Sequence, residues 1–192
     1  MIRASTRLIA HIGYPTHAFK SPMIYNPYFE QAGVDVVVMP MACQAPHYPA
    51  FLKAVFTLDN ICGALITMPH KVTTLQLLDE ASSAAKISGA CNAVRRTDDG
   101  RLIGDMFDGE GFVRGAQRKG CRLAGARVLV VGCGGVGSAI AASLAAAGVA
   151  AIGLFDARPE SAEALAGRLR THYAAIDTRL GSSDPAGYDV VI

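Results

Sequence analysis

The sequence has 192 residues, half of them hydrophobic, which suits one or two globular domains with buried cores. Its formal net charge is +2 and its 18 Lys and Arg residues are scattered, so the charge pattern gives no reason to expect nucleic acid or a membrane surface as a partner. No stretch approaches the roughly 20 apolar residues that cross a bilayer, and the first residues lack the apolar core of a signal peptide. We therefore expect a globular protein outside the nucleic-acid-binding and membrane classes.

The cysteines favour a reducing compartment. Five of them are spread along the chain without a C-x-x-C pair or a metal-ligand spacing, and an odd, scattered set is typical of cytoplasmic proteins. We therefore expect a cytoplasmic protein without a metal site. The histidines at four positions give no signal of a site: His11, His17, His47 and His172.

The first part of the chain alternates between predicted strands and helices. Ser21 and Pro22 predict a helix start, with the serine as the cap and the proline at the first helical position. An Asp-Gly turn at 97–100 predicts a hairpin between the last two strands of this part. Strands are expected at 8–12, 34–39, 63–67, 93–96 and 101–104, and helices at 22–31, 50–56, 72–78, 82–87 and 108–119.

The second part of the chain is organised around a glycine-rich loop. The apolar run 127–131 predicts a strand buried on both faces, and the loop and an Ala-rich helix at 138–147 follow it directly. A second apolar strand is expected at 151–155, a helix at 159–170 and the start of another strand at 189–192.

The loop sequence fits G-x-G-x-x-G in the strand–loop–helix context of a dinucleotide site. Gly132 would permit the tight turn, Gly134 would let the backbone approach a pyrophosphate, and Gly137 would let helix and strand touch. Gly135 and Val136 belong to the same loop, just before the helix N-terminus, whose free N–H groups would hold the phosphates. The alternative is a glycine turn that only packs a strand against a helix.

The alternation of strands and helices predicts an α/β protein with largely parallel sheets. A change in composition near Gly120 divides it into an N-terminal α/β substrate domain and a Rossmann-like nucleotide domain. We place the first at 1–107, a linker helix at 108–121 and the partial nucleotide domain at 122–192. Because the sequence stops inside a predicted strand, we expect a truncated nucleotide domain within a longer protein. A homodimer that covers the apolar edge after Val191 is also among the expected assemblies.

Polar side chains follow the predicted strands of the first domain or begin its helices. Thr67 and Lys71 follow one strand, and Asp108 and Ser21 begin helices. Strand ends and helix starts are where open α/β sheets gather ligands. Each residue also has a structural explanation, because Ser21 and Asp108 could be helix caps, Lys71 a surface charge and Asn92 a turn residue.

Taken together, the polar motifs resemble those of the shikimate dehydrogenase family in order and spacing, from near the start to about Leu165. The resemblance implies a substrate domain, a nucleotide domain and a cleft between them. It also implies an enzyme of aromatic amino acid biosynthesis that interconverts 3-dehydroshikimate and shikimate with NADPH, or related quinate pairs with NAD. The matching segments are 12–15, 20–22, 63–64, 67–71, 89–93, 99–105, 108–109 and 132–135.

By the same resemblance, Lys71 and Asp108 correspond to the family's catalytic pair. Ser21, Thr67 and Asn92 correspond to its substrate-binding hydroxyls and amide, and Asp108 would also hold a substrate hydroxyl. The substrate would be a hydroxylated cyclic carboxylate.

Three departures from the family pattern predict a more apolar pocket. Phe19 stands where the family usually has a serine, Leu65 where it has an asparagine, and Met106 with Phe107 where it often has Asn-Thr. A quinate dehydrogenase or a related enzyme for a less polar substrate is therefore an alternative. A non-catalytic nucleotide-binding protein is a second alternative.

The residue after the second strand of the nucleotide domain bears on the cofactor. Asp156 could accept a hydrogen bond from a ribose 2′-hydroxyl and would repel a 2′-phosphate. Family members that use NADP resemble one another in having an arginine after this strand, and Arg158 is displaced from the matching position. We therefore expect NAD or NADP, with NAD favoured.

Overall fold

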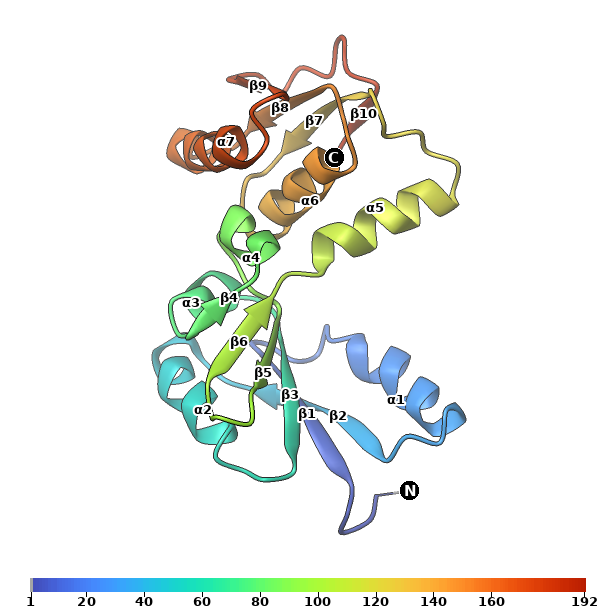
Figure 1. Cartoon of the computed structure of the whole chain (residues 1–192), viewed down its shortest axis with the longest axis vertical. Helices are drawn as coiled ribbons and strands as arrows, with labels where there is room; N and C mark the ends of the chain where they lie inside the picture. Colours follow the sequence, from blue (N-terminus) through green and yellow to red (C-terminus); the bar gives the residue numbers. More distant parts are fainter. Residues whose placement is uncertain (1) are drawn as a thin grey trace. The chain divides into compact units, whose positions relative to one another are not determined.

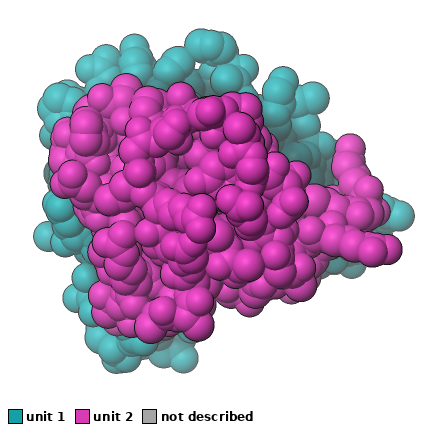
Figure 2. All heavy atoms as spheres, turned by 90° about the horizontal axis from the view of Figure 1, so that it is seen from above, with its two compact units in different colours: residues 1–81, 91–105 teal, residues 82–90, 106–192 magenta. Residues whose placement is uncertain are grey.

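A computed structural model describes residues 2–192 of the chain. These residues form two compact units, each assembled from segments that are apart in the sequence (Figure 2). Unit 1 consists of residues 2–81 and 91–105, and unit 2 of residues 82–90 and 106–192.

Unit 1 is built on a six-stranded mixed sheet with the order β2-β1-β3-β5-β6-β4 (Figure 1). β1 pairs in parallel with β2 and β3, and β5 forms antiparallel pairs with β3 and β6. The strands are β1 (Arg7–Gly13), β2 (Val36–Ala42), β3 (Ile61–Ile66), β4 (Glu80–Ala81), β5 (Ala93–Arg96) and β6 (Leu102–Asp105). The helices are α1 (Ser21–Gln31), the 3-10 turn η1 (Ala45–His47), α2 (Tyr48–Val55) and α3 (Lys71–Leu75).

The core of unit 1 lies on one face of this sheet. Alternate residues of the central strands, such as Ala10 and Ile12 on β1 and Ala64 and Ile66 on β3, pack with α2 and are at most 2% exposed. Because side chains alternate along a strand, His11 and Leu65 point to the opposite face.

Unit 2 is built on a parallel four-stranded sheet with the order β10-β7-β8-β9 (Figure 1). The order is that of one half of a doubly wound nucleotide-binding sheet. The strands are β7 (Arg127–Val131), β8 (Ala151–Phe155), β9 (Asp177–Leu180) and β10 (Val190–Val191), and the helices are α4 (Ser83–Ser88), α5 (Asp108–Arg118), α6 (Gly135–Ala146) and α7 (Pro159–His172).

Two close contacts join helices within unit 2. A Cβ added at Gly109 of α5 would collide with the backbone oxygen of Ala139 and the hydroxyl of Ser143 on α6, so only glycine allows these helices to come so near. Arg168 of α7 donates from Nε to the carbonyl oxygen of Ile87, at 2.7 Å, near the end of α4. The bond from Arg168 connects the short segment 82–90 to the rest of unit 2.

The predicted α/β class with parallel sheets is confirmed, and β7 and β8 have the predicted bounds. The expectation that Ser21 caps α1 is wrong, because the helix begins at Ser21, its cap is Lys20, and no side chain bonds to the open end. α6 begins at Gly135, three residues before the prediction. The functional boundaries 1–107, 108–121 and 122–192 stay predictions, although α5 packs as a part of unit 2.

Two properties concern the chain as a whole. Within residues 2–192, no helix combines the length and apolar character needed to span a bilayer. All five cysteines are free thiols, and Cys43, Cys91 and Cys133 are buried.

Candidate active site

The glycine-rich loop has the geometry that a dinucleotide pyrophosphate needs. Gly132 has φ of 106°, a left-handed conformation that favours glycine. A Cβ at Gly137 would collide with the carbonyl oxygen of Gly132, whereas a Cβ at Gly134 would meet open space. The loop therefore approaches α6 tightly on one side and leaves the backbone accessible at Gly134.

The N-terminus of α6 follows at once. Gly134 is the cap residue, and no side chain bonds to the first N–H groups of the helix. Gly135, Val136 and Gly137 thus form the first turn of α6, where backbone N–H groups lie at the positive end of the helix dipole, the arrangement that favours anions at helix starts. Ser138 is 1% exposed and donates from Oγ to the carbonyl oxygen of Cys133 at 2.9 Å, which fixes the loop from within.

Asp156 joins the end of β8 to this loop. Its carboxylate accepts hydrogen bonds from the backbone N–H of Cys133, at 2.7 Å, and of Arg158, at 2.9 Å. The bond from Arg158, and then that from Cys133, lowers the pKa of Asp156, so the group is charged at neutral pH. Burial, with the Asp156 charge beside it, raises the pKa of the Cys133 thiol to about 11. The Arg158 side chain is exposed.

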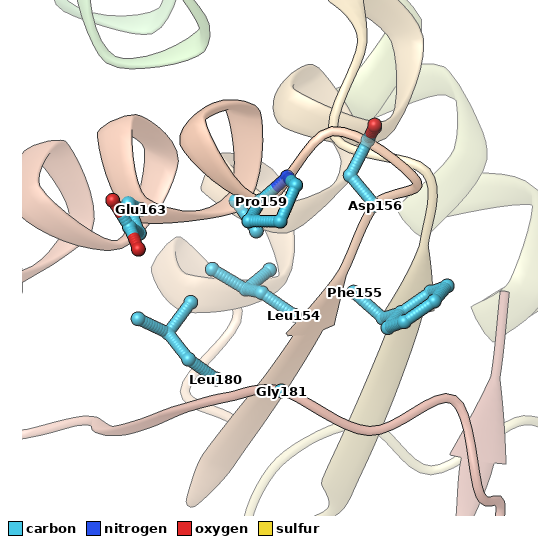
Figure 3. A pocket seen from close by; sticks show the side chains of 8 residues that line it. Leu154, Phe155, Asp156, Pro159, Glu163, Leu180 and Gly181 are labelled. Atoms are coloured by element: carbon cyan, nitrogen blue, oxygen red, sulfur yellow. The ribbon is translucent and has the colours of Figure 1, made fainter.

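A pocket of about 130 Å³ borders Asp156 at the ends of β8 and β9. Leu154, Leu180 and Pro159 give it an apolar lining, with Glu163 at one side (Figure 3). The ring of Phe155 points away from this space (Figure 3). Sequence reasoning did not find this pocket, because β9 is separated from β8 by the whole of α7.

In unit 1, the loop from Thr67 to Lys71 joins β3 to α3. The backbone N–H of Thr67 donates to the carbonyl oxygen of Ile12 at 3.0 Å, and that of Tyr14 donates to the carbonyl oxygen of Met68 at 2.9 Å. The N–H of Cys91 donates to the carbonyl oxygen of Lys71 at 2.9 Å. Lys71 is the first residue of α3 and is half-buried.

His70 anchors the residue before Lys71. It is 1% exposed, its Nε2 is 2.8 Å from the carbonyl oxygen of Cys43, and its ring stacks on Tyr48. The Tyr48 hydroxyl lies 2.6 Å from Oγ1 of Thr74, which donates to the carbonyl oxygen of His70 at 2.8 Å. This network fixes the backbone at the start of α3.

His11 on β1 is a buried histidine near Lys71 that sequence reasoning did not single out. Its ring stacks on Phe19 with centroids 4.1 Å apart. Burial, and then the charge of Lys71, lowers the pKa of His11, so the imidazole is neutral at neutral pH and within electrostatic reach of the lysine. The sequence gives no signal of this, because Phe19 comes from the loop after β1.

The remaining predicted residues are distributed over both units. Ser21 begins α1, and Asn92 precedes β5 with its N–H donating to the carbonyl oxygen of Asp105 at 3.0 Å. Lys71 belongs to unit 1, whereas Asp108 is the first residue of α5 in unit 2. The pairing of Lys71 with Asp108 therefore stays a prediction.

Comparisons with known proteins agree with this geometry. A family model for the shikimate dehydrogenase substrate-binding domain matches residues 11–94, and one for the ThiF family matches 113–158. The shikimate dehydrogenase (NADP+) of Geobacter metallireducens is 37% identical over 152 residues, which are 79% of this chain and 52% of that protein. The chain belongs to the shikimate dehydrogenase family. It spans about half the length of the curated relatives it matches.

Solved structures of related folds extend over both units. The shikimate 5-dehydrogenase of Listeria monocytogenes, in complex with shikimate and NAD, has a TM-score of 0.86 at 27% identity, covering 94% of this chain and 62% of that one. The 5-ketofructose reductase of Gluconobacter sp. strain CHM43 has a TM-score of 0.83 at 28% identity, covering 97% of this chain and 68% of that one. The family fold is therefore shared by proteins named for different carbonyl substrates.

Proposed function

We propose that the protein is an NAD(P)-dependent oxidoreductase that interconverts a ring carbonyl and its alcohol, with 3-dehydroshikimate and shikimate as the pair. The observation that carries the proposal is Lys71 at the start of α3, preceded by the buried His70, in a chain whose relatives are named shikimate dehydrogenase. Bound nicotinamide supplies the hydride for reduction or accepts it for oxidation.

Lys71 acts on the oxygen of the reacting carbonyl. Negative charge grows on that oxygen as the carbon is reduced, and an ammonium group stabilises the charge and delivers the proton. In the reverse direction the amine removes the proton of the alcohol. Asp108 is proposed to hold a neighbouring substrate hydroxyl and to orient the lysine.

The other polar residues hold the substrate. Thr67 lies in the same loop as Lys71, and Ser21 and Asn92 follow β1 and precede β5 in the same unit. Their hydroxyl and amide groups can bond the hydroxyls and carboxylate of a cyclic acid.

The nucleotide is proposed to bind along the glycine-rich loop. Its pyrophosphate would lie on Gly134, Gly135 and the N-terminus of α6, with the adenosine ribose at Asp156. The apolar pocket beside Asp156 suits the adenine base. A negative carboxylate disfavours a 2′-phosphate, so NAD is favoured over NADP, although Arg158 is near enough in sequence to serve a phosphate if its loop shifts.

A neutral hydroxylated ketone is the second candidate substrate. Phe19, which replaces a hydroxyl that would hold a carboxylate, covers His11 with an apolar ring. The likeness to a 5-ketofructose reductase points the same way. If no alcohol or ketone reacts, the protein binds a nucleotide without catalysing turnover.

Two further features are part of the proposal. Five free thiols suit the reducing cytoplasm. A homodimer remains the proposed assembly.

The full-length protein tests the activity directly. We expect shikimate to drive reduction of NAD+ or NADP+, followed by absorbance at 340 nm, with a higher kcat/KM for NAD+. Turnover of quinate or a ketohexose without turnover of shikimate would favour the alternative substrates. Nucleotide binding with no turnover of any of them would refute the proposal.

A further inference from the structure

His11 lies where β1 delivers side chains to the face opposite the core of unit 1. Its neighbours Ala10 and Ile12 belong to the core, so alternation turns the imidazole away from it. Leu65 is its register partner on β3 and points to the same face. A Cβ at Gly13, also on this face, would collide with the methyl group of Thr67, so the substrate-binding loop passes directly over this end of the strand.

The imidazole of His11 is covered by a surface loop and not by the core. Its side chain is 5% exposed, and Phe19 stacks over it with the ring planes 28° apart. Phe19 itself is only partly buried, and Tyr14, His17 and Lys20 in the same loop are exposed. Movement of this aromatic ring would therefore uncover one face of the imidazole.

The Nδ1 atom of His11 has no hydrogen-bond partner. Within residues 2–192 it is the one buried side-chain nitrogen or oxygen in that condition. A buried polar atom without a partner costs folding free energy, so nearly all such atoms are paired in native proteins. A polar ligand that reaches the ring would remove this cost at the moment of binding.

The charge of Lys71 and the chemistry of the imidazole indicate which ligand group would bind to His11. The Lys71 ammonium acts electrostatically on His11 within the same unit. A neutral imidazole has one N–H donor and one acceptor nitrogen. A hydroxyl group matches either nitrogen because it can donate and accept, whereas a carboxylate can only accept.

We propose that His11 is a substrate-binding residue that hydrogen-bonds a hydroxyl group of the molecule whose carbonyl Lys71 protonates, with Phe19 moving off the ring to admit it. The inference rests on the proposed oxidoreductase function and adds to it a recognition group for a substrate hydroxyl. It assigns Phe19 the role of an apolar cover that a ligand displaces.

The test is a titration of the full-length protein with shikimate, followed on the histidine Cε1–H resonances by NMR, with NADP+ present. We expect the His11 signal, assigned through His11→Leu, to shift until saturation. His11→Leu should weaken shikimate binding two- to tenfold and leave NADP+ affinity unchanged, and His11→Asn should recover part of the loss. The melting temperature of His11→Leu should equal or exceed that of the wild type, since the unpaired nitrogen is removed. The exposed His47→Ala serves as the matched control.

The outcomes separate this inference from the proposed activity. Turnover of shikimate with an unmoved His11 signal, or equal binding by His11→Leu, overturns the role of His11 alone. A saturable shift and weaker binding by His11→Leu, without turnover, uphold that role and overturn the activity. Neither turnover nor a shift overturns both. If His11→Leu fails to fold, His11→Asn supplies the same assignment, and the wild-type titration still decides the matter.

Discussion

The imidazole of His70 lies flat on the ring of Tyr48, with centroids 3.9 Å apart and planes 5° apart. The pair is buried, and hydrogen bonds from it reach Cys43 and Thr74. Because Lys71 follows His70 directly, this stack fixes the backbone from which the proposed catalytic lysine extends. The chemistry of the loop thus depends on a core contact made by α2.

Tyr48→Phe should separate the hydrogen bond from the stack. It keeps the ring on His70 but removes the hydroxyl that meets Thr74, so we expect a loss of about 0.5–1.5 kcal/mol in the free energy of unfolding. Tyr48→Leu should cost more because the aromatic contact is lost as well. Urea unfolding measures both, with the exposed Tyr25→Phe as control. Equal stabilities for wild type and both variants would contradict the role of the pair.

The buried histidines should make unit 1 less stable in mild acid. Burial lowers the pKa of His11 and of His70 below the ordinary 6.5, with Lys71 adding to the effect on His11 and the bond to Cys43 opposing it on His70. Below pH 6.5 the unfolded chain binds protons before the folded unit does, so the free energy of unfolding falls as pH decreases. We expect a decline between pH 7 and 5 that is smaller in His11→Leu/His70→Gln. If the free energy of unfolding falls equally with pH in the wild type and in the double variant, the two histidines are not the cause of the decline.

Gly109→Ala should disrupt the contact between α5 and α6. The added Cβ meets the backbone oxygen of Ala139, which cannot move without shifting α6, and overpacking of this kind costs about 1–3 kcal/mol or more. Gly111→Ala is a matched control on the same helix, because its Cβ would meet open space, and it should stabilise the protein by about 0.5–1 kcal/mol. Thermal unfolding of the two variants should therefore move in opposite directions, and equal shifts would argue against this helix contact.

Asp156→Asn should change the nucleotide preference. It removes the negative charge that disfavours a 2′-phosphate and retains a carbonyl oxygen that can accept from Cys133 or Arg158. We expect the ratio of kcat/KM for NADP+ over NAD+ to rise roughly tenfold, as the loss of one nearby unit charge implies. Asp177→Asn, on the exposed strand β9, serves as the control. An unchanged ratio would place the 2′ position away from Asp156.

The nucleotide unit was largely predictable from the sequence. β7 and β8 are buried on both faces, so their apolar runs mark their ends. Gly132, Gly134 and Gly137 have the geometry that their places in the motif imply. The start of α6 was misplaced because Gly135 to Gly137 were assigned to the loop although they form the first helical turn. The cap of α1 was misplaced for the same reason, since Ser21, expected as the cap, is already helical.

Contacts between distant segments could not be predicted. Residues 82–90 join unit 2 through Arg168, about 80 positions further along the chain. The ring of His11 stacks on Phe19 from a surface loop, and the ring of His70 is held in place by its stack on Tyr48. Periodicity and motifs describe neighbours in sequence, so they give no signal of these pairs.

Lys71→Ala tests the central claim most directly. In the full-length protein, kcat for shikimate oxidation should fall about 10²–10⁴-fold, the usual contribution of a general acid–base. The Kd for the nucleotide should stay within about twofold, since the glycine-rich loop belongs to the other unit, and the exposed Lys53→Ala should retain wild-type turnover. Turnover by Lys71→Ala at the wild-type rate would contradict the proposed mechanism.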